Sequence, residues 1–298
     1  MRWLFSFLLA TSPVAAAYTP SWALQDETKG WNAKALVEAY FHNSEMQRQW
    51  AWELLGKEPL SGAENILDFG CGDGKVSAEI ARLVPQGTVT GVDISAEMIH
   101  FAHIKFPPYA YPNLAFQQSN SLTFDDIPEE SLYDLICSFC VFHLVAHPQK
   151  ILKSFKEHLT PGGKLMFVVP AGKNPALFRA ADEMFVKYQL EAPWKNQSVS
   201  RVSPTRTVEG WRVLLQEAGF TIKSLEMIDT DTAFYSREEL VAAMMSTTTA
   251  NWNIPLEVSP HFFEDLVERM CELDSEIIDE EGRVHYKLSR IHVVALSN

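Results

Sequence analysis

Positive charge is scarce in this chain. Its 298 residues include 25 Lys and Arg against 38 Asp and Glu, which gives a net charge of −13. The sequence has no basic run and no stripe in which basic and aromatic residues alternate. Duplex nucleic acid and anionic membrane surfaces both require concentrated positive charge on the protein that binds them. We therefore expect neither as a partner.

Cysteine is equally sparse, with four residues at positions 71, 137, 140 and 271 that do not form the pattern of a disulfide framework. Cys137 and Cys140 have the spacing of a redox pair or of half a zinc site. They lie in an apolar stretch that we expect to be a strand, where residues three apart point to opposite faces. No second Cys/His pair follows, so a metal site is not expected.

Long apolar runs are missing too, and the N-terminus has only a short one. Arg2 precedes the apolar residues 3–10, and the small residues 14–17 follow. This order is typical of a secretory signal that is cleaved after about Ala17, and it is too short to span a bilayer. We predict a leader over residues 1–17; an apolar N-terminal tail or a misplaced start codon is the alternative.

Glycine is not abundant, but three of the 14 glycines fall within five positions, at Gly70, Gly72 and Gly74. An apolar run enters this turn, an amphipathic helix follows it, and a second apolar run ends at Asp93 about one βα unit later. Doubly wound sheets bind nucleosides in this way, with the glycines close to the ligand and the acid on the ribose hydroxyls. The dinucleotide fingerprint needs a glycine where Lys75 stands. Another kind of nucleotide-binding sheet, or a dehydrogenase, stays open as an alternative.

The fold class follows from the alternation of short apolar strands with helices. We expect a helix over 32–55, then strands at 66–69, 88–92, 114–117, 132–139 and 164–169, with helices between them. Beyond Pro170 we expect helices at 176–188, 208–218, 238–245 and 261–277 and strands at 221–228 and 288–296. This order predicts an α/β protein with a doubly wound, mostly parallel, seven-stranded sheet, an N-terminal helical lid and a C-terminal helical cap. The predicted division is a leader (1–17), a core with its lid helix (30–170), and a region with the cap helices and the last two strands (171–298).

Residues 36–167 resemble Rossmann-like methyltransferases that depend on S-adenosylmethionine (SAM). Within that superfamily the chain is most similar to the trans-aconitate, malonyl-carrier and juvenile-hormone-acid methyltransferases, which methylate carboxyl groups. The resemblance implies a set of cofactor contacts: Asp68, Gly70, Gly72, Gly74, Asp93, Ile94, Met98, Asn120, Ser121 and Ser138. In such a protein the glycine turn wraps the methionine portion, Asp68 helps to hold its ammonium group, and Asp93 takes both ribose hydroxyls.

Two segments depart from the family pattern. Residues 118–121 stand where the family has Gly-Asp-Ala, so that Asn120 replaces an acid that accepts from the adenine amine. An amide oxygen can still accept that bond. After the fourth strand, the family's hydrophobic-His/Gln-Trp sequence becomes Phe142-His143-Leu144, which keeps the His and loses the Trp. The acceptor pocket is therefore less well defined by the resemblance than the cofactor site.

Candidates for the acceptor side are few. His143 is the catalytic candidate, and Tyr40 and Gln47 match the family's lid helix. Trp194, Arg201 and Trp252 are further substrate candidates. His143 could equally be a core or capping residue, the tryptophans could pack the cap, and Arg201 with Arg206 could be solvated loop residues.

The expected function follows from the cofactor. A sulfonium methyl is already activated, so the protein mainly aligns the acceptor and excludes water. A carboxylate acceptor needs a positive or hydrogen-bonding clamp, whereas an amine or phenol needs a base. We predict a SAM-dependent enzyme that O-methylates a small acid. An exported methyltransferase that acts on a protein, or a non-catalytic binding module, is the alternative. The leader suggests export, whereas SAM suggests action in a cytosol.

Overall fold

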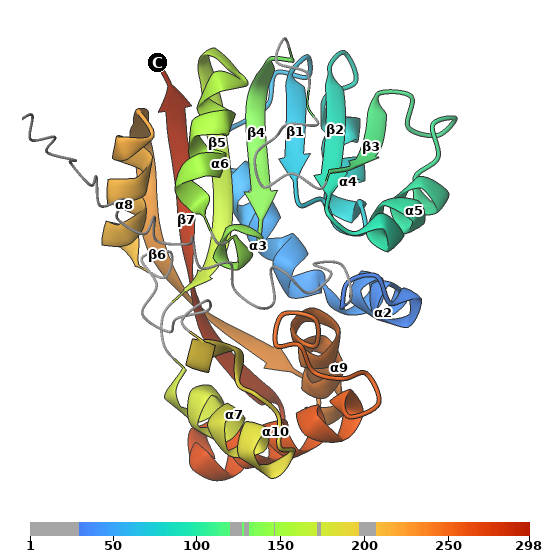
Figure 1. Cartoon of the computed structure of the whole chain (residues 1–298), viewed down its shortest axis with the longest axis vertical. Helices are drawn as coiled ribbons and strands as arrows, with labels where there is room; N and C mark the ends of the chain where they lie inside the picture. Colours follow the sequence, from blue (N-terminus) through green and yellow to red (C-terminus); the bar gives the residue numbers. More distant parts are fainter. Residues whose placement is uncertain (1–29, 120–126, 128–130, 146, 172–173, 197–206) are drawn as a thin grey trace, which may run out of the picture.

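The computed structural model describes residues 30–119, 127, 131–145, 147–171, 174–196 and 207–298 (Figure 1). Three groups of predictions fall outside these residues: the leader over 1–17, the adenine contacts Asn120 and Ser121, and the loop arginines Arg201 and Arg206. They stay predictions.

Seven strands form one sheet in the order β3-β2-β1-β4-β5-β7-β6. The strands are β1 (Asn65–Phe69), β2 (Thr88–Asp93), β3 (Leu114–Gln118), β4 (Tyr133–Phe139), β5 (Leu159–Ala171), β6 (Phe220–Phe234) and β7 (Val284–Ser297). β1 to β5 pair in parallel, and β7 runs antiparallel to both β5 and β6. The doubly wound, mostly parallel fold predicted from the sequence is confirmed.

Helices cover both faces of this sheet because its central strands are apolar on both sides. The helices that pack on its two faces are α3 (Glu45–Leu55), α4 (Lys75–Leu83), α5 (Ala96–Lys105), α6 (Pro148–Glu157) and α8 (Val208–Glu217). One buried cluster joins α3, α4 and α5 to the face that carries Ile66 and Leu135. The other cluster joins α6 and α8 to the face that carries Leu67 and Ile136.

Three strands are longer than the sequence predicted. β5, β6 and β7 have 13, 15 and 14 residues, and the pairing of β6 with β7 continues to Phe234 and Val284 after a bulge between Ile222 and Ser224. They run past the core and carry three helices, which we call the cap: α7 (Pro175–Lys187), α9 (Arg237–Thr248) and α10 (Ser259–Leu273) (Figure 1). α9 and α10 lie between β6 and β7 in the chain, as expected.

The N-terminal helix predicted over 32–55 is instead two helices, α2 (Lys34–Asn43) and α3, which we call the lid. The break is at Ser44, whose φ of −95° and ψ of 23° lie outside the helical region. Lys75 stabilises the break, because its ammonium group donates to the Phe41 carbonyl and to the Ser44 hydroxyl. The lid therefore turns a corner directly beside the glycine turn.

Within the described part of the chain, none of the helices has the length and apolar character that a membrane crossing requires.

Candidate active site

The glycine turn joins β1 to α4 and holds three residues in the left-handed region. Gly70, Gly72 and Gly74 have φ values of +77°, +52° and +78°. A Cβ atom on Gly70 would lie 2.2 Å from Cγ2 of Val141, and one on Gly74 would lie 2.6 Å from Cζ of Phe116. A Cβ atom on Gly72 would lie 3.8 Å from Cε1 of Tyr40, the one atom of the described residues within 4 Å of it apart from its chain neighbours. Two glycines thus allow close contact within the core, while the middle one leaves an open backbone surface beneath the lid.

Asp93 ends β2 beside this turn. Its carboxylate accepts from the backbone N–H of Gly72 at 2.9 Å and from that of Ser95 at 2.9 Å. Burial raises the pKa of this carboxyl group, and the backbone donors oppose the rise. Each oxygen accepts one backbone bond and retains a lone pair for a further donor. The side chain is therefore fixed in place and still able to bind a hydroxyl group.

Asp68 lies in β1 just before the turn and Asp73 lies within it, and they are 1% and 4% exposed. Asp68 accepts from the Ser77 hydroxyl at 2.5 Å, and Asp73 accepts from the Lys75 N–H at 3.0 Å. Burial raises the pKa of Asp68 to about 7, with the charges of Asp93 and Asp73 adding to the effect. Oδ1 of Asp68 and Oδ2 of Asp73 have no hydrogen-bond partner among the described residues. Such buried acceptors suit a ligand that brings positive charge or N–H groups.

The lid covers these carboxylates with Tyr40 and Gln47. Burial and the neighbouring acids raise the pKa of Tyr40 well above its usual value. Oε1 of Gln47 is buried, without a hydrogen-bond partner among the described residues. A cavity of about 30 Å³ lies between the lid and the turn, and its walls include Tyr40, Ser44, Gln47, Asp68, Gly70, Asp73, Lys75 and Phe139. This space suits a water molecule and is smaller than a nucleoside.

The end of β4 meets the end of β1 at the same edge. Ser138 is buried, and its hydroxyl donates to the Phe69 carbonyl at 2.8 Å. The following 3₁₀ turn, Phe142–Leu144, is anchored by Phe142, which packs among the rings of Phe69, Phe155, Phe167 and Trp211. His143 lies on this turn and is partly buried. The structure thus brings Ser138 and His143 to the same sheet edge as the glycine turn.

The remaining candidates separate into two groups. Ile94 follows Asp93 directly and is partly buried, and Met98 is buried in the first turn of α5. Trp194 and Trp252 lie together in the cap, with ring centroids 5.5 Å apart and both in contact with Phe185. The first pair therefore adjoins Asp93, whereas the tryptophans belong to the aromatic cluster of the cap.

A family model described as a methyltransferase domain matches residues 60–219, from the approach to β1 to the end of α8. The chain belongs to this family. It is a SAM-dependent methyltransferase with the Rossmann-like fold that the resemblance implied.

Sequence similarity to individual curated methyltransferases covers only part of the chain. The methyltransferase is 30% identical over 197 residues to the malonyl-[acyl-carrier protein] O-methyltransferase of Paenibacillus sp., covering 63% of this chain and 68% of that one. It is 36% identical over 127 residues to the trans-aconitate 2-methyltransferase of Deinococcus radiodurans, covering 42% of this chain and 45% of the relative. The chain thus matches about half the length of that second enzyme, so its own acceptor does not follow from the match.

Solved structures show the same fold at low sequence identity. The YcgJ protein of Bacillus subtilis superposes with a TM-score of 0.58 at 15% identity, covering 84% of this chain and 99% of that one. The [4+2]-cyclase SpnF superposes with a TM-score of 0.51 at 16% identity, covering 83% and 80%. A cyclase therefore shares this fold, and the chemistry must be argued from the site.

The residues around the turn fit SAM. SAM carries positive charge on its sulfonium and ammonium groups, and the turn offers buried carboxylate oxygens that lack a partner among the described residues. Gly72 presents an open backbone surface on which a ligand can lie. No group of His, Cys, Asp and Glu within the described ranges has a metal-binding arrangement. The buried carboxylate oxygens and the Gly72 surface are suited to a cationic organic cofactor.

Arg290 is a residue near this edge that sequence reasoning missed. It lies on β7 between Ser289 and Ile291 and is 2% exposed, and the strand continues with His292, Val293 and Val294. The available signal was an arginine directly before the more apolar end of a strand, because charged residues are rarely buried without a specific partner.

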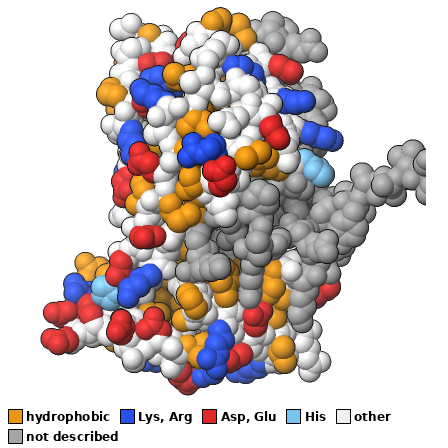
Figure 2. Space-filling model, turned by 90° about the vertical axis from the view of Figure 1, so that its left-hand side faces the viewer, with side chains coloured by type: hydrophobic (Ala, Val, Ile, Leu, Met, Phe, Trp, Pro, Cys, Tyr) orange, Lys and Arg blue, Asp and Glu red, His pale blue; other side chains and the backbone are white. Residues whose placement is uncertain are grey.

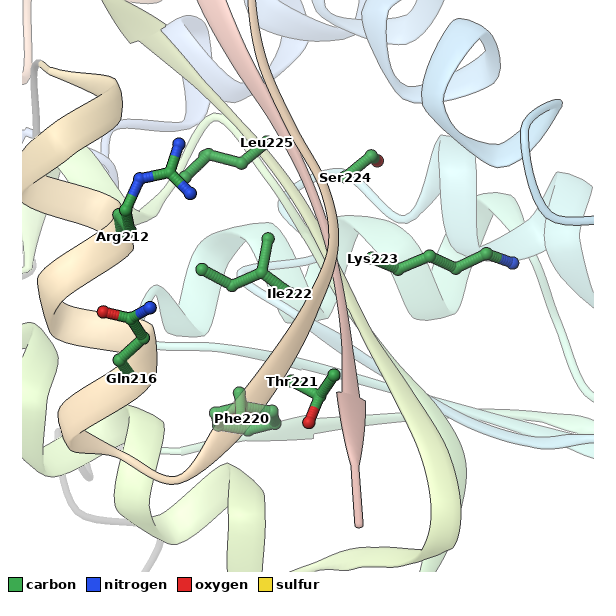
Figure 3. Close-up of a pocket in the computed structure, with 8 residues that line it drawn as sticks. All are labelled: Arg212, Gln216, Phe220, Thr221, Ile222, Lys223, Ser224 and Leu225. Atoms are coloured by element: carbon green, nitrogen blue, oxygen red, sulfur yellow. The ribbon is translucent and has the colours of Figure 1, made fainter.

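A separate groove of about 530 Å³ runs between α8 and the edge strand β6. Arg212 and Gln216 extend from α8 toward Ile222 and Leu225, whereas Lys223 points to the other side of the strand (Figure 3). Figure 2 shows this side of the methyltransferase, with apolar side chains set among charges of both signs. β6 is four places from β1 in the sheet, so this groove is distinct from the glycine turn.

Proposed function

We propose that this methyltransferase transfers the methyl group of SAM to an oxygen of a small carboxylic acid. SAM binding is supported by one observation. Three carboxylates surround the glycine turn, and two of them have a buried oxygen without a partner in the described chain. The acceptor half is supported by the relatives, whose names specify malonyl and trans-aconitate groups.

Bound SAM supplies a methyl group that is already activated on a sulfonium centre. The roles of this chain's residues are then binding, orientation and exclusion of water. Asp93, held by the N–H groups of Gly72 and Ser95, accepts from the ribose hydroxyls. Asp68 and Asp73 provide negative charge to the amino-acid end, and Ile94 and Met98 flank the adenine.

The acceptor lies between the end of β4 and the lid in this proposal. A carboxylate is ionised at neutral pH, so no residue has to remove a proton from it. His143 instead donates a hydrogen bond to the acid and orients it, while Tyr40 and Gln47 close over the reacting atoms. The small cavity beneath the lid supports this, because a closed lid excludes water from the methyl group.

The test is release of S-adenosylhomocysteine by the purified chain with SAM and a panel of acceptors. The panel contains di- and tricarboxylic acids, including malonate and trans-aconitate, together with amines and phenols. We expect turnover with acids alone, and we expect His143→Ala to lower turnover more than it lowers SAM affinity. Turnover with amines or phenols alone would contradict the acid assignment, and unchanged turnover in His143→Ala would return His143 to a structural role.

A further inference from the structure

Arg290 lies at the edge of the sheet where the acceptor is expected. Phe139, the last residue of β4, is level with Val168 of β5, which pairs with His292 of β7. Arg290 pairs with Pro170 and is therefore two residues beyond the end of β4. Open α/β sheets bind their ligands at this carboxyl edge.

The Arg290 side chain points to the face that the lid helix α3 covers. Its guanidinium carbon is 5.1 Å from the centroid of the Trp50 ring. Next to it, Cys140 follows β4 and donates its backbone N–H to Val168 at 2.8 Å. The positive charge of Arg290 lowers the pKa of Cys140, although burial dominates and raises it to about 12. Cys140 in turn raises the pKa of Tyr40, so these groups share one region above β4.

The carboxylate that neutralises the buried Arg290 belongs to an exposed residue, Glu53. The guanidinium donates to the Glu53 carboxylate, to the Thr230 hydroxyl and, at 2.9 Å, to Nε2 of His292. The Arg290 side chain is 3% exposed, whereas that of Glu53 is 53% exposed. Burial and the Arg290 charge lower the pKa of His292 to about 4, so the imidazole stays neutral and acts as an acceptor. The buried cation is thus neutralised by a carboxylate that lies on the lid and remains largely in water.

We propose that Arg290 binds a carboxylate of the acceptor, and that Glu53 occupies the guanidinium until the acceptor arrives. The planar guanidinium matches a carboxylate through two parallel hydrogen bonds. Glu53 is already well hydrated, so its release costs less than the release of a buried carboxylate. This inference rests on the proposed function, and it assigns a specificity residue to it.

The chemistry indicates which carboxylate Arg290 holds. Hydrogen bonds from a guanidinium withdraw electron density from an oxygen and weaken it as a nucleophile. Arg290 therefore holds a carboxylate that does not react, while a second carboxyl group of the same molecule takes the methyl group. The acceptor is accordingly a di- or tricarboxylic acid.

The experiment compares three variants with the wild type: Arg290→Met, Arg290→Lys and Glu53→Gln. The assay measures KM and kcat for malonate and trans-aconitate, and for malonamate, in which one carboxylate is an amide. Calorimetry measures SAM affinity in parallel. Arg269→Met is the matched control, because it removes an arginine that pairs with Glu183 and Glu272 in the cap.

We expect Arg290→Met to raise KM for the diacids by roughly 30-fold or more, with SAM affinity unchanged. The preference for malonate over malonamate disappears in this variant and survives in part in Arg290→Lys. Glu53→Gln keeps KM at or below the wild-type value, because it removes the competing carboxylate. Arg269→Met leaves all of these values unchanged.

A purely structural tie between Arg290 and Glu53 predicts a different pattern. Arg290→Met and Glu53→Gln would then weaken diacid binding and thermal stability equally, and that result would overturn the inference. If Arg290→Met fails to fold, the KM of Glu53→Gln for diacids still tests the proposal. A rise in that KM would contradict it. If the wild type methylates acids without preferring diacids, the role of Arg290 is wrong but the proposed function stands. If the wild type methylates no acid, the proposed function is wrong as well.

Discussion

The carboxylates of the site differ in how far the protein satisfies them. Asp93 accepts two backbone N–H groups, one from the glycine turn and one from the start of α5. Asp68 accepts from the Ser77 hydroxyl and Asp73 from the Lys75 N–H, and each keeps one buried oxygen without a partner in the described chain. Asp93 is thus oriented in advance, whereas the other two are destabilised until a positive ligand arrives.

Replacing Asp93 tests the first of these roles. We expect Asp93→Ala to weaken SAM binding by about 2 kcal/mol or more, roughly thirtyfold, because charge-assisted hydrogen bonds to the ribose are lost. Titration calorimetry measures the change. Asp229→Ala is the control, since Asp229 lies on β6 and is bonded to Ser289. Unaltered SAM affinity in Asp93→Ala would mean that the ribose binds elsewhere.

Asp68 gives the site a pH dependence. Its pKa is about 7 in the folded protein, well above that of an unfolded aspartate, because burial disfavours the charged form. Its contribution to the free energy of unfolding is therefore fully present below the unfolded pKa and is lost as the pH rises through about 7. SAM binding has the opposite trend, because a cation prefers the ionised carboxylate.

We accordingly expect the increase in melting temperature on adding SAM to be larger at pH 8 than at pH 6. Thermal unfolding at both pH values, with and without SAM, measures it. In Asp68→Asn this difference should shrink, since the amide does not titrate. A pH dependence that is the same in Asp68→Asn would assign it to another group.

Residues whose partners are near in sequence were the ones that could be predicted. Gly70, Gly72 and Gly74 lie in one turn, and Asp93 ends the next strand, so a local pattern identifies them. Arg290 depends on Glu53, 237 residues away, and on Thr230, 60 residues away. No local pattern encodes such contacts, and only the folded sheet brings them together.

At the level of elements, α3 is packed into the core through Trp50 and Leu54, and α2 packs against α9 of the cap. α2 and α3 meet at Ser44, and Lys75 bonds to the Phe41 carbonyl and to the Ser44 hydroxyl. The Lys75 ammonium group also lies over the Phe41 ring, 4.5 Å from its centroid. We expect this corner to open when the cofactor binds, because the cavity beneath it is about 30 Å³.

We expect Lys75→Met to accelerate release of S-adenosylhomocysteine by roughly tenfold, because it removes about 1–2 kcal/mol of hydrogen bonding while keeping an apolar chain on Phe41. Stopped-flow fluorescence of the lid tryptophans follows the release. Lys105→Met is a close control, since the Lys105 ammonium group lies 5.2 Å from the centroid of the same ring but extends from the end of α5. Equal effects of the two substitutions would show that the ring contact, rather than the bonds of Lys75, holds the lid.

The elements themselves could be predicted to different degrees. The helices after β1 and β2 follow from apolar spacing, and α5 begins at a Ser95 cap that is visible in the sequence. The corner in the predicted helix 32–55 could not be seen, because Lys75, a distant residue, stabilises it. The extra length of β6 was missed because residues 229–233 are polar or small and resemble a loop until β7 pairs with them.

At the scale of the whole molecule, one sheet serves both the core and the cap. β5, β6 and β7 extend beyond the carboxyl edge and carry α7, α9 and α10 (Figure 1). The lid and the Arg290 region lie at this same edge. The division at residues 170 and 171 stays a prediction. Limited proteolysis tests it, because these strands extend from the core into the cap.

The leader is a prediction at this scale too. We expect a mature chain that begins at about Tyr18, with activity only in a compartment that supplies SAM. Fractionation followed by mass spectrometry of the N-terminus measures this. An intact Met1 in the soluble cytosolic fraction would contradict cleavage and favour the apolar-tail alternative.

The central claim is that the site at the glycine turn methylates an oxygen of an acid. The most direct test supplies SAM that is isotopically labelled in its methyl group, together with malonate or trans-aconitate, and identifies the product by NMR. We expect a methyl ester in an amount equal to that of S-adenosylhomocysteine. In Asp93→Ala at low SAM concentration, we expect no ester. A labelled methyl group on nitrogen, carbon or a phenol oxygen, with no ester formed from any acid of the panel, would contradict it.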